Sequence, residues 1–157
     1  MVNPILVFAY GNPSSGDDAL GPLLIERLEA RQRAGELKGV ELLTDFQLQV
    51  EHALDLADRE LVLFVDAAAT GPEPFTFTCV SPEQDASYTT HAMSPGAVLR
   101  VYEQTTGDAP PTTWLVAIRG YAFDLGAPLS PRAGRNVSLA EDHLLSFLRS
   151  AGLRSPV

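Results

Sequence analysis

Leu61-Val62-Leu63-Phe64-Val65-Asp66 decides the fold, because five apolar residues in a row end at a single acid. A short, unbroken apolar run is typical of a strand that is buried on both faces of a parallel sheet. The same form occurs in Ile5-Leu6-Val7-Phe8-Ala9 and in Trp114-Leu115-Val116-Ala117-Ile118. These three runs predict the central strands of a sheet.

Two further strands are expected from weaker signals. Residues 40–44 form a short apolar segment, and residues 75–80 alternate between apolar and polar side chains. Alternation is typical of a half-exposed strand at the edge of a sheet. The sequence therefore predicts five strands, and the strand at residues 75–80 is the one that we expect at an edge.

Helical spacing separates these strands. Leucines at helical intervals predict a helix over residues 18–33, and an apolar stripe predicts another over residues 50–57; the stripe consists of Val50, Ala53, Leu54 and Ala57. Ser94-Pro95 is a typical helix start, with serine as cap and proline in the first turn. Ser138-Leu139-Ala140-Glu141 fits a capping box that opens the last helix.

Strands that alternate with helices indicate an α/β fold. We expect residues 1–157 to form a single domain with one open, mostly parallel five-stranded sheet and helices on both faces. One edge strand is free to run antiparallel. A domain of 157 residues with 45% apolar side chains can bury a core of ordinary size.

Composition and charge exclude several kinds of partner. Twenty acidic and eleven basic residues give a net charge of −9, which is unsuited to a nucleic-acid backbone. The chain has neither an apolar run of the ~18–20 residues that a membrane helix needs nor a signal-peptide pattern. Cys79 is the only cysteine, so a disulfide frame is excluded. We expect a cytoplasmic monomer.

Polar side chains follow the predicted strands where ligands bind in such sheets. Asp17 and Asp18 lie in the loop after the first strand, Asp66 closes the third, and His91 precedes a helix start. One imidazole with one or two carboxylates, from three loops, is a mixed nitrogen and oxygen set for a divalent transition metal.

Each of these residues also has a purely structural interpretation. Asp17 and Asp18 can cap the following helix, where negative charge complements the helix dipole. Asp66 can form a turn, and a lone histidine such as His91 is more often structural than a ligand. The carboxylates also occupy the positions at which a phosphate-binding loop needs Lys and Ser or Thr, so no organic phosphate cofactor is expected.

The other two histidines are weaker candidates. His52 points away from the apolar stripe of its predicted helix, so we expect it to be solvated or functional. His143 flanks the apolar stripe of the last helix and is expected to pack partly buried.

Three motifs in register resemble the nickel–iron (NiFe) hydrogenase maturation endopeptidases. These motifs are Gly11-Asn12 followed by Asp17-Asp18-Ala19-Leu20-Gly21, the Asp66 that ends an apolar strand, and Thr89-Thr90-His91 before a helix. The resemblance spans almost the whole chain. The chain departs from the family pattern in two places. Ser14 stands where an apolar residue is common, and residues 45–49 replace a Gly-Gly-Thr turn.

The resemblance implies a carboxy-terminal processing protease. Such an enzyme removes the extension of a hydrogenase large-subunit precursor after nickel has been inserted into that subunit. It implies that Asp18, Asp66 and His91 are the catalytic and metal-binding residues, and that they recognise the nickel of the substrate. Asp17 would then be a neighbour rather than a ligand. Residues 45–52 resemble the branch that serves soluble, NAD-linked hydrogenases, in which Gln47, Gln49 and Glu51 would contact the large subunit.

Two other hypotheses remain open at this stage. One is a non-catalytic α/β module that binds a metal or a flavin. The other is a plain scaffold in which the acids are only helix caps. Neither motif spacing nor composition decides whether a bound metal would polarise the scissile carbonyl and activate water or serve only for recognition.

Overall fold

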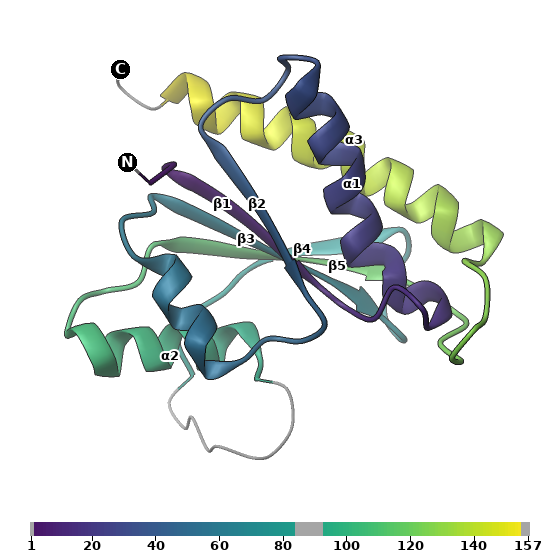
Figure 1. Cartoon of the computed structure of the whole chain (residues 1–157), viewed down its shortest axis with the longest axis horizontal. Helices are drawn as coiled ribbons and strands as arrows, with labels where there is room; N and C mark the ends of the chain where they lie inside the picture. The colour runs from purple at the N-terminus through teal and green to yellow at the C-terminus, as the bar shows by residue number, and fades with distance from the viewer. Residues whose placement is uncertain (1, 84–92, 155–157) are drawn as a thin grey trace.

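The central strands form because their residues are apolar on both sides. A computed structural model describes residues 2–83 and 93–154. Its five-stranded sheet has the order β2-β1-β3-β5-β4 (Figure 1). The strand bounds are Ile5–Tyr10 for β1, Val40–Asp45 for β2, Leu61–Ala68 for β3, Phe75–Cys79 for β4 and Thr112–Arg119 for β5. Every side chain of β1 is buried, as expected for a central strand.

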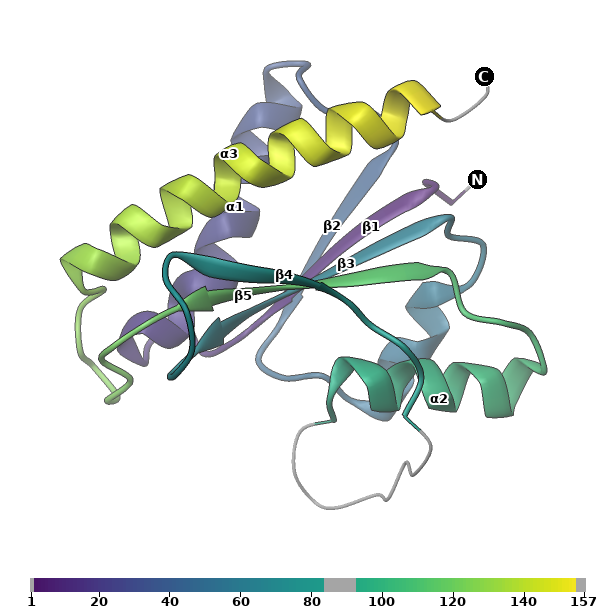
Figure 2. The same ribbon diagram turned by 180° about the vertical axis from the view of Figure 1, so that it is seen from behind.

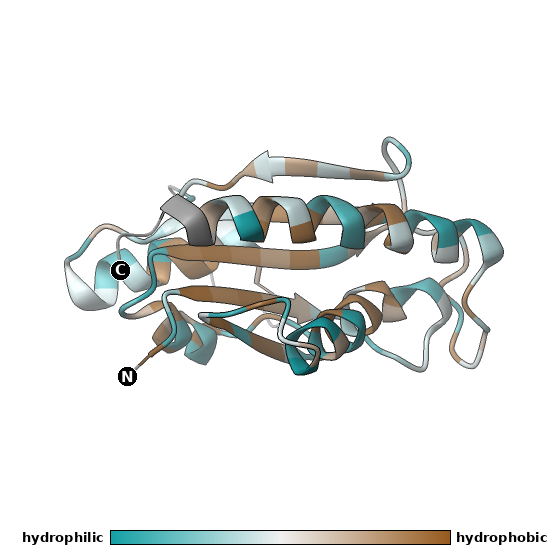
Figure 3. Cartoon of the chain, turned by 90° about the horizontal axis from the view of Figure 1, so that it is seen from above, coloured by the Kyte–Doolittle hydropathy of each residue, from teal (hydrophilic) through white to brown (hydrophobic). Residues whose placement is uncertain are grey.

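Four strands are parallel and the fifth is antiparallel, which confirms the predicted fold class. β1 pairs in parallel with both β2 and β3, and β3 pairs in parallel with β5. β4 lies at the edge and runs antiparallel to β5. Figure 3 shows the inner strands as the brown, hydrophobic ones and β4 as paler, as the alternation of residues 75–80 predicted.

Helices cover both faces of this sheet. The helical bounds are Gly16–Ala19 for the 3₁₀ helix η1, Leu20–Arg33 for α1, Val50–Leu56 for the 3₁₀ helix η2, Pro95–Thr106 for α2 and Pro131–Arg154 for α3. α1 and α3 pack on one face around Val7, Leu63 and Leu144. η2 and α2 cover the other face around Phe8, Phe64 and Val98 (Figures 1 and 2).

The predicted start of the last helix was wrong. α3 begins at Pro131, seven residues before Ser138, and the Ser130 hydroxyl accepts a hydrogen bond from the Ala133 amide at 3.3 Å. Ser138 lies inside the helix, where its hydroxyl donates to the Gly134 carbonyl at 3.1 Å. The start of α2 at Ser94-Pro95 is confirmed, because the Ser94 hydroxyl accepts from the Ala97 amide.

The predicted helix over residues 50–57 was also wrong in its type and its buried face. The segment forms a 3₁₀ helix, whose repeat of three residues turns Ala53 and Leu56 inward. Leu54 is 74% exposed and Val50 is 44% exposed, although an α-helical stripe would have buried both.

Candidate active site

Asp66 is held at the carboxyl end of β3 on the face that η2 and α2 cover. Side chains alternate along a strand, and Val62 and Phe64 belong to the core on this face, so Asp66 projects the same way. Its carboxylate accepts a hydrogen bond from the Ala67 amide at 2.8 Å.

Two features raise the pKa of Asp66 and two lower it. Burial raises the pKa most; the Ala67 hydrogen bond lowers it, the nearby charge of Asp18 raises it, and a hydrogen bond with Tyr10 lowers it. The net result is a pKa of about 6. The structure therefore brings Asp18 and Asp66 close enough to repel each other.

Tyr10 connects β1 to this carboxylate. Ala9 pairs with Val65, so Tyr10, the last residue of β1, lies beside Asp66, which is two residues before the end of β3. Burial first, and then the charge of Asp66 and the hydrogen bond with it, raise the pKa of Tyr10. The phenol therefore stays protonated and donates to the Asp66 carboxylate.

Asp18 is positioned by the turn between β1 and η1. Its carboxylate accepts a hydrogen bond from the Asn12 amide at 2.6 Å. The turn requires a glycine at position 11, because a Cβ there would lie 2.1 Å from the Asp18 carbonyl oxygen, and φ is +152°. The alternative in which Asp18 caps the following helix is wrong, because the N-caps of η1 and α1 are Ser15 and Ala19 and neither helix start has a side-chain capping hydrogen bond.

Asp17 is a buried anchor rather than a helix cap or a ligand. It is fully buried, and its carboxylate accepts hydrogen bonds of 2.7–3.0 Å from the amides of Tyr121, Ala122 and Ser130 and from the Ser130 hydroxyl. Burial acts to raise the pKa of Asp17, but these hydrogen bonds outweigh it and hold the pKa below its usual value. Asp17 thus joins η1 to the loop before α3.

His91 lies outside the described residues, so only the flanks of its segment can be located. The Glu83 amide donates to the Gly96 carbonyl at 3.0 Å, and the Met93 amide donates to the Leu48 carbonyl at 3.1 Å. Met93 packs against the core beneath η2 and α2. Both flanks therefore join the face on which Asp66 projects. Within the described ranges, no group of three His, Cys, Asp or Glu side chains has metal-binding geometry.

The loop after β2 is held in place by His52, for which the sequence predicted a solvated or functional side chain. The expectation that His52 is solvated or functional was wrong in its first part, because His52 is only 8% exposed. Its Nδ1 accepts from the Gln49 amide at 2.8 Å, so Nε2 carries the proton and donates to the Asp45 carboxylate at 3.0 Å. The Gly11 amide in turn donates to the Asp45 carbonyl at 3.1 Å. The turn holding Asp18 is thereby linked to η2.

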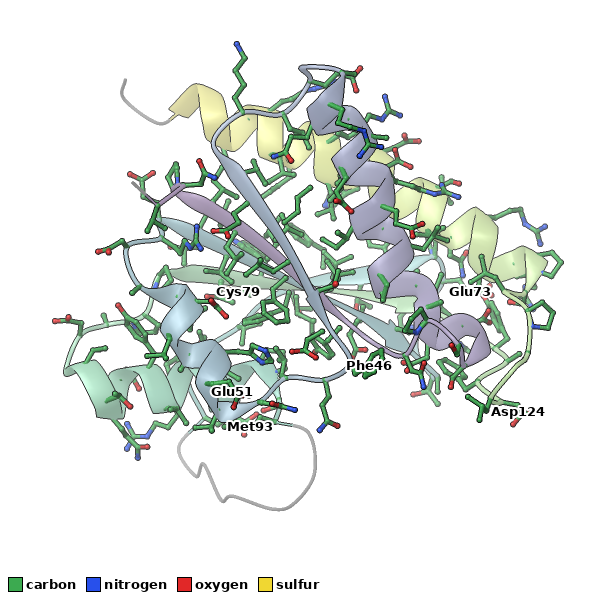
Figure 4. All side chains as sticks on the ribbon, in the orientation of Figure 1. Phe46, Glu51, Glu73, Cys79, Met93 and Asp124 are labelled. Atoms are coloured by element: carbon green, nitrogen blue, oxygen red, sulfur yellow. The ribbon has the colours of Figure 1, made fainter. Side chains whose placement is uncertain are left out.

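His143 and Cys79 lie away from this site. The expectation that His143 is partly buried was wrong, because the residue is exposed. Its ring nevertheless contacts the rings of Phe75 and Phe77 on β4, with centroids 5.2 and 4.7 Å apart. Cys79 is exposed at the end of the same strand (Figure 4). Neither residue takes part in the carboxylate site.

Several solved structures with a similar fold are described as hydrogenase maturation proteases. The HybD maturation endopeptidase of Escherichia coli is similar at 24% identity with a TM-score of 0.71. The HycI protease of Thermococcus kodakarensis is similar at 23% identity with a TM-score of 0.70, and a solution structure described as an endopeptidase from E. coli is similar at 25% with a TM-score of 0.67. Each comparison covers 94% of this chain and 93% of the other chain.

The chain has the fold of the hydrogenase maturation proteases. The similarity indicated by the three motifs is thus confirmed in three dimensions, over almost the whole chain. No protein-family model matches the sequence, and no curated protein matches it significantly. Among the described residues, none of the helices is long and apolar enough to span a membrane.

Proposed function

We propose that this protein is a processing endopeptidase that removes the carboxy-terminal extension of a NiFe hydrogenase large-subunit precursor. The observation that carries the proposal is the meeting of two carboxylates, Asp18 and Asp66, at the carboxyl edge of the sheet. It is supported by the fold, which matches proteases described as hydrogenase maturation enzymes.

The charge of the pair favours a cationic ligand. Within the described residues, neither Asp18 nor Asp66 forms an ion pair with Lys, Arg or His, and the charge of Asp18 disfavours the ionised form of Asp66. A divalent metal ion relieves this repulsion. Carboxylate oxygens with an imidazole nitrogen suit nickel, so His91 is the proposed third ligand.

The nickel in this proposal belongs to the substrate and not to the protease. Asp18, Asp66 and His91 would bind the nickel of a loaded precursor and so place its carboxy-terminal segment against the site. When bound, the metal supplies either an electrophile for the scissile carbonyl or an activated water. The chain's own contribution is positional: Tyr10 orients Asp66, and the Asn12 amide orients Asp18.

Location, domain organisation, oligomeric state and cofactor use complete the proposal. We propose a cytoplasmic site of action, a single domain, a monomeric state and no organic cofactor. The preference for a soluble, NAD-linked hydrogenase also remains a prediction based on residues 45–52.

Incubation of the protein with nickel-loaded and nickel-free precursor tests the proposed function. The mass of the large subunit should fall by the mass of the extension in the nickel-loaded sample only. If neither form is shortened, the protein is not this endopeptidase. A flavin absorbance in the purified protein, or flavin binding that is unaffected by Asp18→Asn, would instead support a non-catalytic module.

A further inference from the structure

An apolar groove lies between η2 and α2, on the face of the sheet that carries Asp66. It has a volume of about 260 Å³. Its apolar lining comes from both helices and consists of Val50, Ala53, Leu54, Ala57, Val101 and Tyr102. Figure 1 shows the two helices side by side over this face.

Exposed apolar side chains are concentrated beside this groove. Six large apolar residues of the described chain are clearly exposed, and three of them fall within residues 46–54. Two of these three, Val50 and Leu54, line the groove. The 3₁₀ geometry of η2 keeps them outside the core, so they provide contact area without contributing to the fold.

The charge around the groove selects the kind of partner. Among the described residues, Glu51 is the one charged side chain that lines it, and it is exposed. Asp58 and Asp108, also exposed, follow closely after the lining residues Ala57 and Thr106. A second copy of this chain, with a charge of −9, would bring acid against acid. A partner with an apolar side chain framed by basic residues is complementary.

The groove is physically joined to the candidate active site. The His52 ring on η2 donates a hydrogen bond to the Asp45 carboxylate. The Asp45 carbonyl accepts a hydrogen bond from the Gly11 amide, in the turn that holds Asp18. The Leu48 carbonyl accepts a hydrogen bond from the amide of Met93, which precedes α2. Glu51 and Met93 are labelled in Figure 4 where η2 meets the start of α2. A partner seated in the groove is therefore held at a fixed position relative to Asp18 and Asp66.

We propose that this η2–α2 groove is a docking surface for the folded body of the precursor, separate from the site that acts on its carboxy-terminal segment. The inference rests on the proposed function. The groove binds an apolar side chain of the precursor surface that has basic residues around it. This contact raises the affinity for the substrate without taking part in the chemical step.

Steady-state processing of nickel-loaded precursor by Leu54→Lys tests the proposal. We expect KM to rise at least about tenfold, as for the loss of an apolar anchor, with kcat unchanged. Leu139→Lys is the matched control, because Leu139 is 51% exposed on α3, on the opposite face. It should leave both constants unchanged. Equal thermal midpoints would show that both variants fold.

A second arm tests the charge. Glu51→Lys should raise KM severalfold at low salt, and the difference should shrink as salt screens it. A KM for Leu54→Lys equal to that of wild type, or an equal rise in Leu139→Lys, would overturn the docking proposal while leaving the endopeptidase intact. A wild-type dimer that Leu54→Lys dissociates, with unchanged KM, would overturn it in favour of a second copy. Failure of wild type to process the precursor would instead overturn the proposed function.

Discussion

Asp66 carries an electrostatic cost that the fold alone does not require. Burial and the charge of Asp18 raise its pKa from 3.8 to about 6, so its ionised form is disfavoured in the folded chain. Strained or repulsive groups of this kind are concentrated at functional sites, where a ligand relieves the cost. In the proposed enzyme, nickel of the precursor is that ligand.

Asp66→Asn should stabilise the metal-free protein at neutral pH. The pKa of Asp66 is raised on folding, so the penalty is absent below pH 3.8, grows as the pH rises to about 6, and is constant above that. We expect a higher thermal midpoint for Asp66→Asn at pH 8, by about 2–4 °C for each kcal/mol of relief. Thermal unfolding in chelator from pH 4 to 8 measures this.

The control for this experiment is Asp124→Asn, in an exposed loop (Figure 4). It should unfold at the wild-type temperature throughout. A wild-type protein that is as stable as Asp66→Asn at pH 8 would show that Asp66 carries no such penalty.

Asp17→Asn should destabilise the protein and Asp18→Asn should not. The Asp17 carboxylate is fully buried and accepts hydrogen bonds from three backbone amides and one hydroxyl. In Asp17→Asn the side-chain NH2 group replaces one of the accepting oxygens, so it faces N–H or O–H donors and those bonds are lost. We expect a loss of about 2–4 kcal/mol, measured by urea unfolding at pH 7.

The pH dependence of the same pair provides a check. Because folding lowers the pKa of Asp17, its contribution is present above pH 3.8 and is lost as the pH falls through the lower, folded-state pKa. The difference between wild type and Asp17→Asn should therefore shrink in acid. A larger loss of stability in Asp18→Asn than in Asp17→Asn would reverse the roles assigned to the two residues.

At the scale of residues, local patterns predicted only part of the site. Asp66 could be located because strand alternation and an apolar run are local features. The role of Asp17 depends on Tyr121 and Ser130, which are 104 and 113 positions away, and no local pattern reports such contacts. The burial of His52 likewise depends on Asp45 and on the ring of Phe8, 4.6 Å between centroids.

At the scale of elements, apolar runs predicted the strands better than capping patterns predicted the helices. Ser138 and Glu141 match a capping box, but Glu141 instead pairs with Arg27 and Arg31 from α1. η2 is 3₁₀ rather than α-helical, with reciprocal hydrogen bonds between Gln49 and His52 at its start. Tertiary contacts decide where these helices begin and which helical type they adopt, and the periodicity of the sequence carries no information on such contacts.

The turn between β1 and η1 gives a prediction at this scale. Gly11→Ala places a Cβ 2.1 Å from the Asp18 carbonyl and must displace Asp18, so processing should fall by about 100-fold or more. Gly35→Ala is the matched control, because φ is also positive there (+80°) but no atom lies within 4 Å. It should cost about 1–2 kcal/mol of stability and leave processing intact.

Rates of processing of nickel-loaded precursor, together with urea unfolding, separate the two effects. If Gly11→Ala processes at the wild-type rate, the close approach of Gly11 to Asp18 does not matter for the reaction.

At the scale of the whole molecule, the two faces of the sheet differ in what they do. α1 and α3, of 14 and 24 residues, cover one face with the larger core. The other face carries the shorter η2 and α2, the groove between them, the side chain of Asp66 and both flanks of the His91 segment. One face mainly stabilises the fold, and the other is the face on which we place docking and cleavage.

The sheet could be predicted at this scale, but the groove could not. Alternation of strands and helices restricts the topology through right-handed crossovers, and the half-polar strand at residues 75–80 indicated an edge. The groove results from the exposed side chains of a 3₁₀ helix, which the helical stripe placed in the core.

The central claim is that Asp18, Asp66 and His91 act as one site. It is tested most directly by the rate at which nickel-loaded precursor is shortened by Asp18→Asn, Asp66→Asn, His91→Gln and the triple variant. Groups that act as a unit are not additive, so each single variant should lose about as much activity as the triple variant, by at least about 100-fold, while remaining folded. Processing at the wild-type rate by folded Asp66→Asn and His91→Gln would contradict the account.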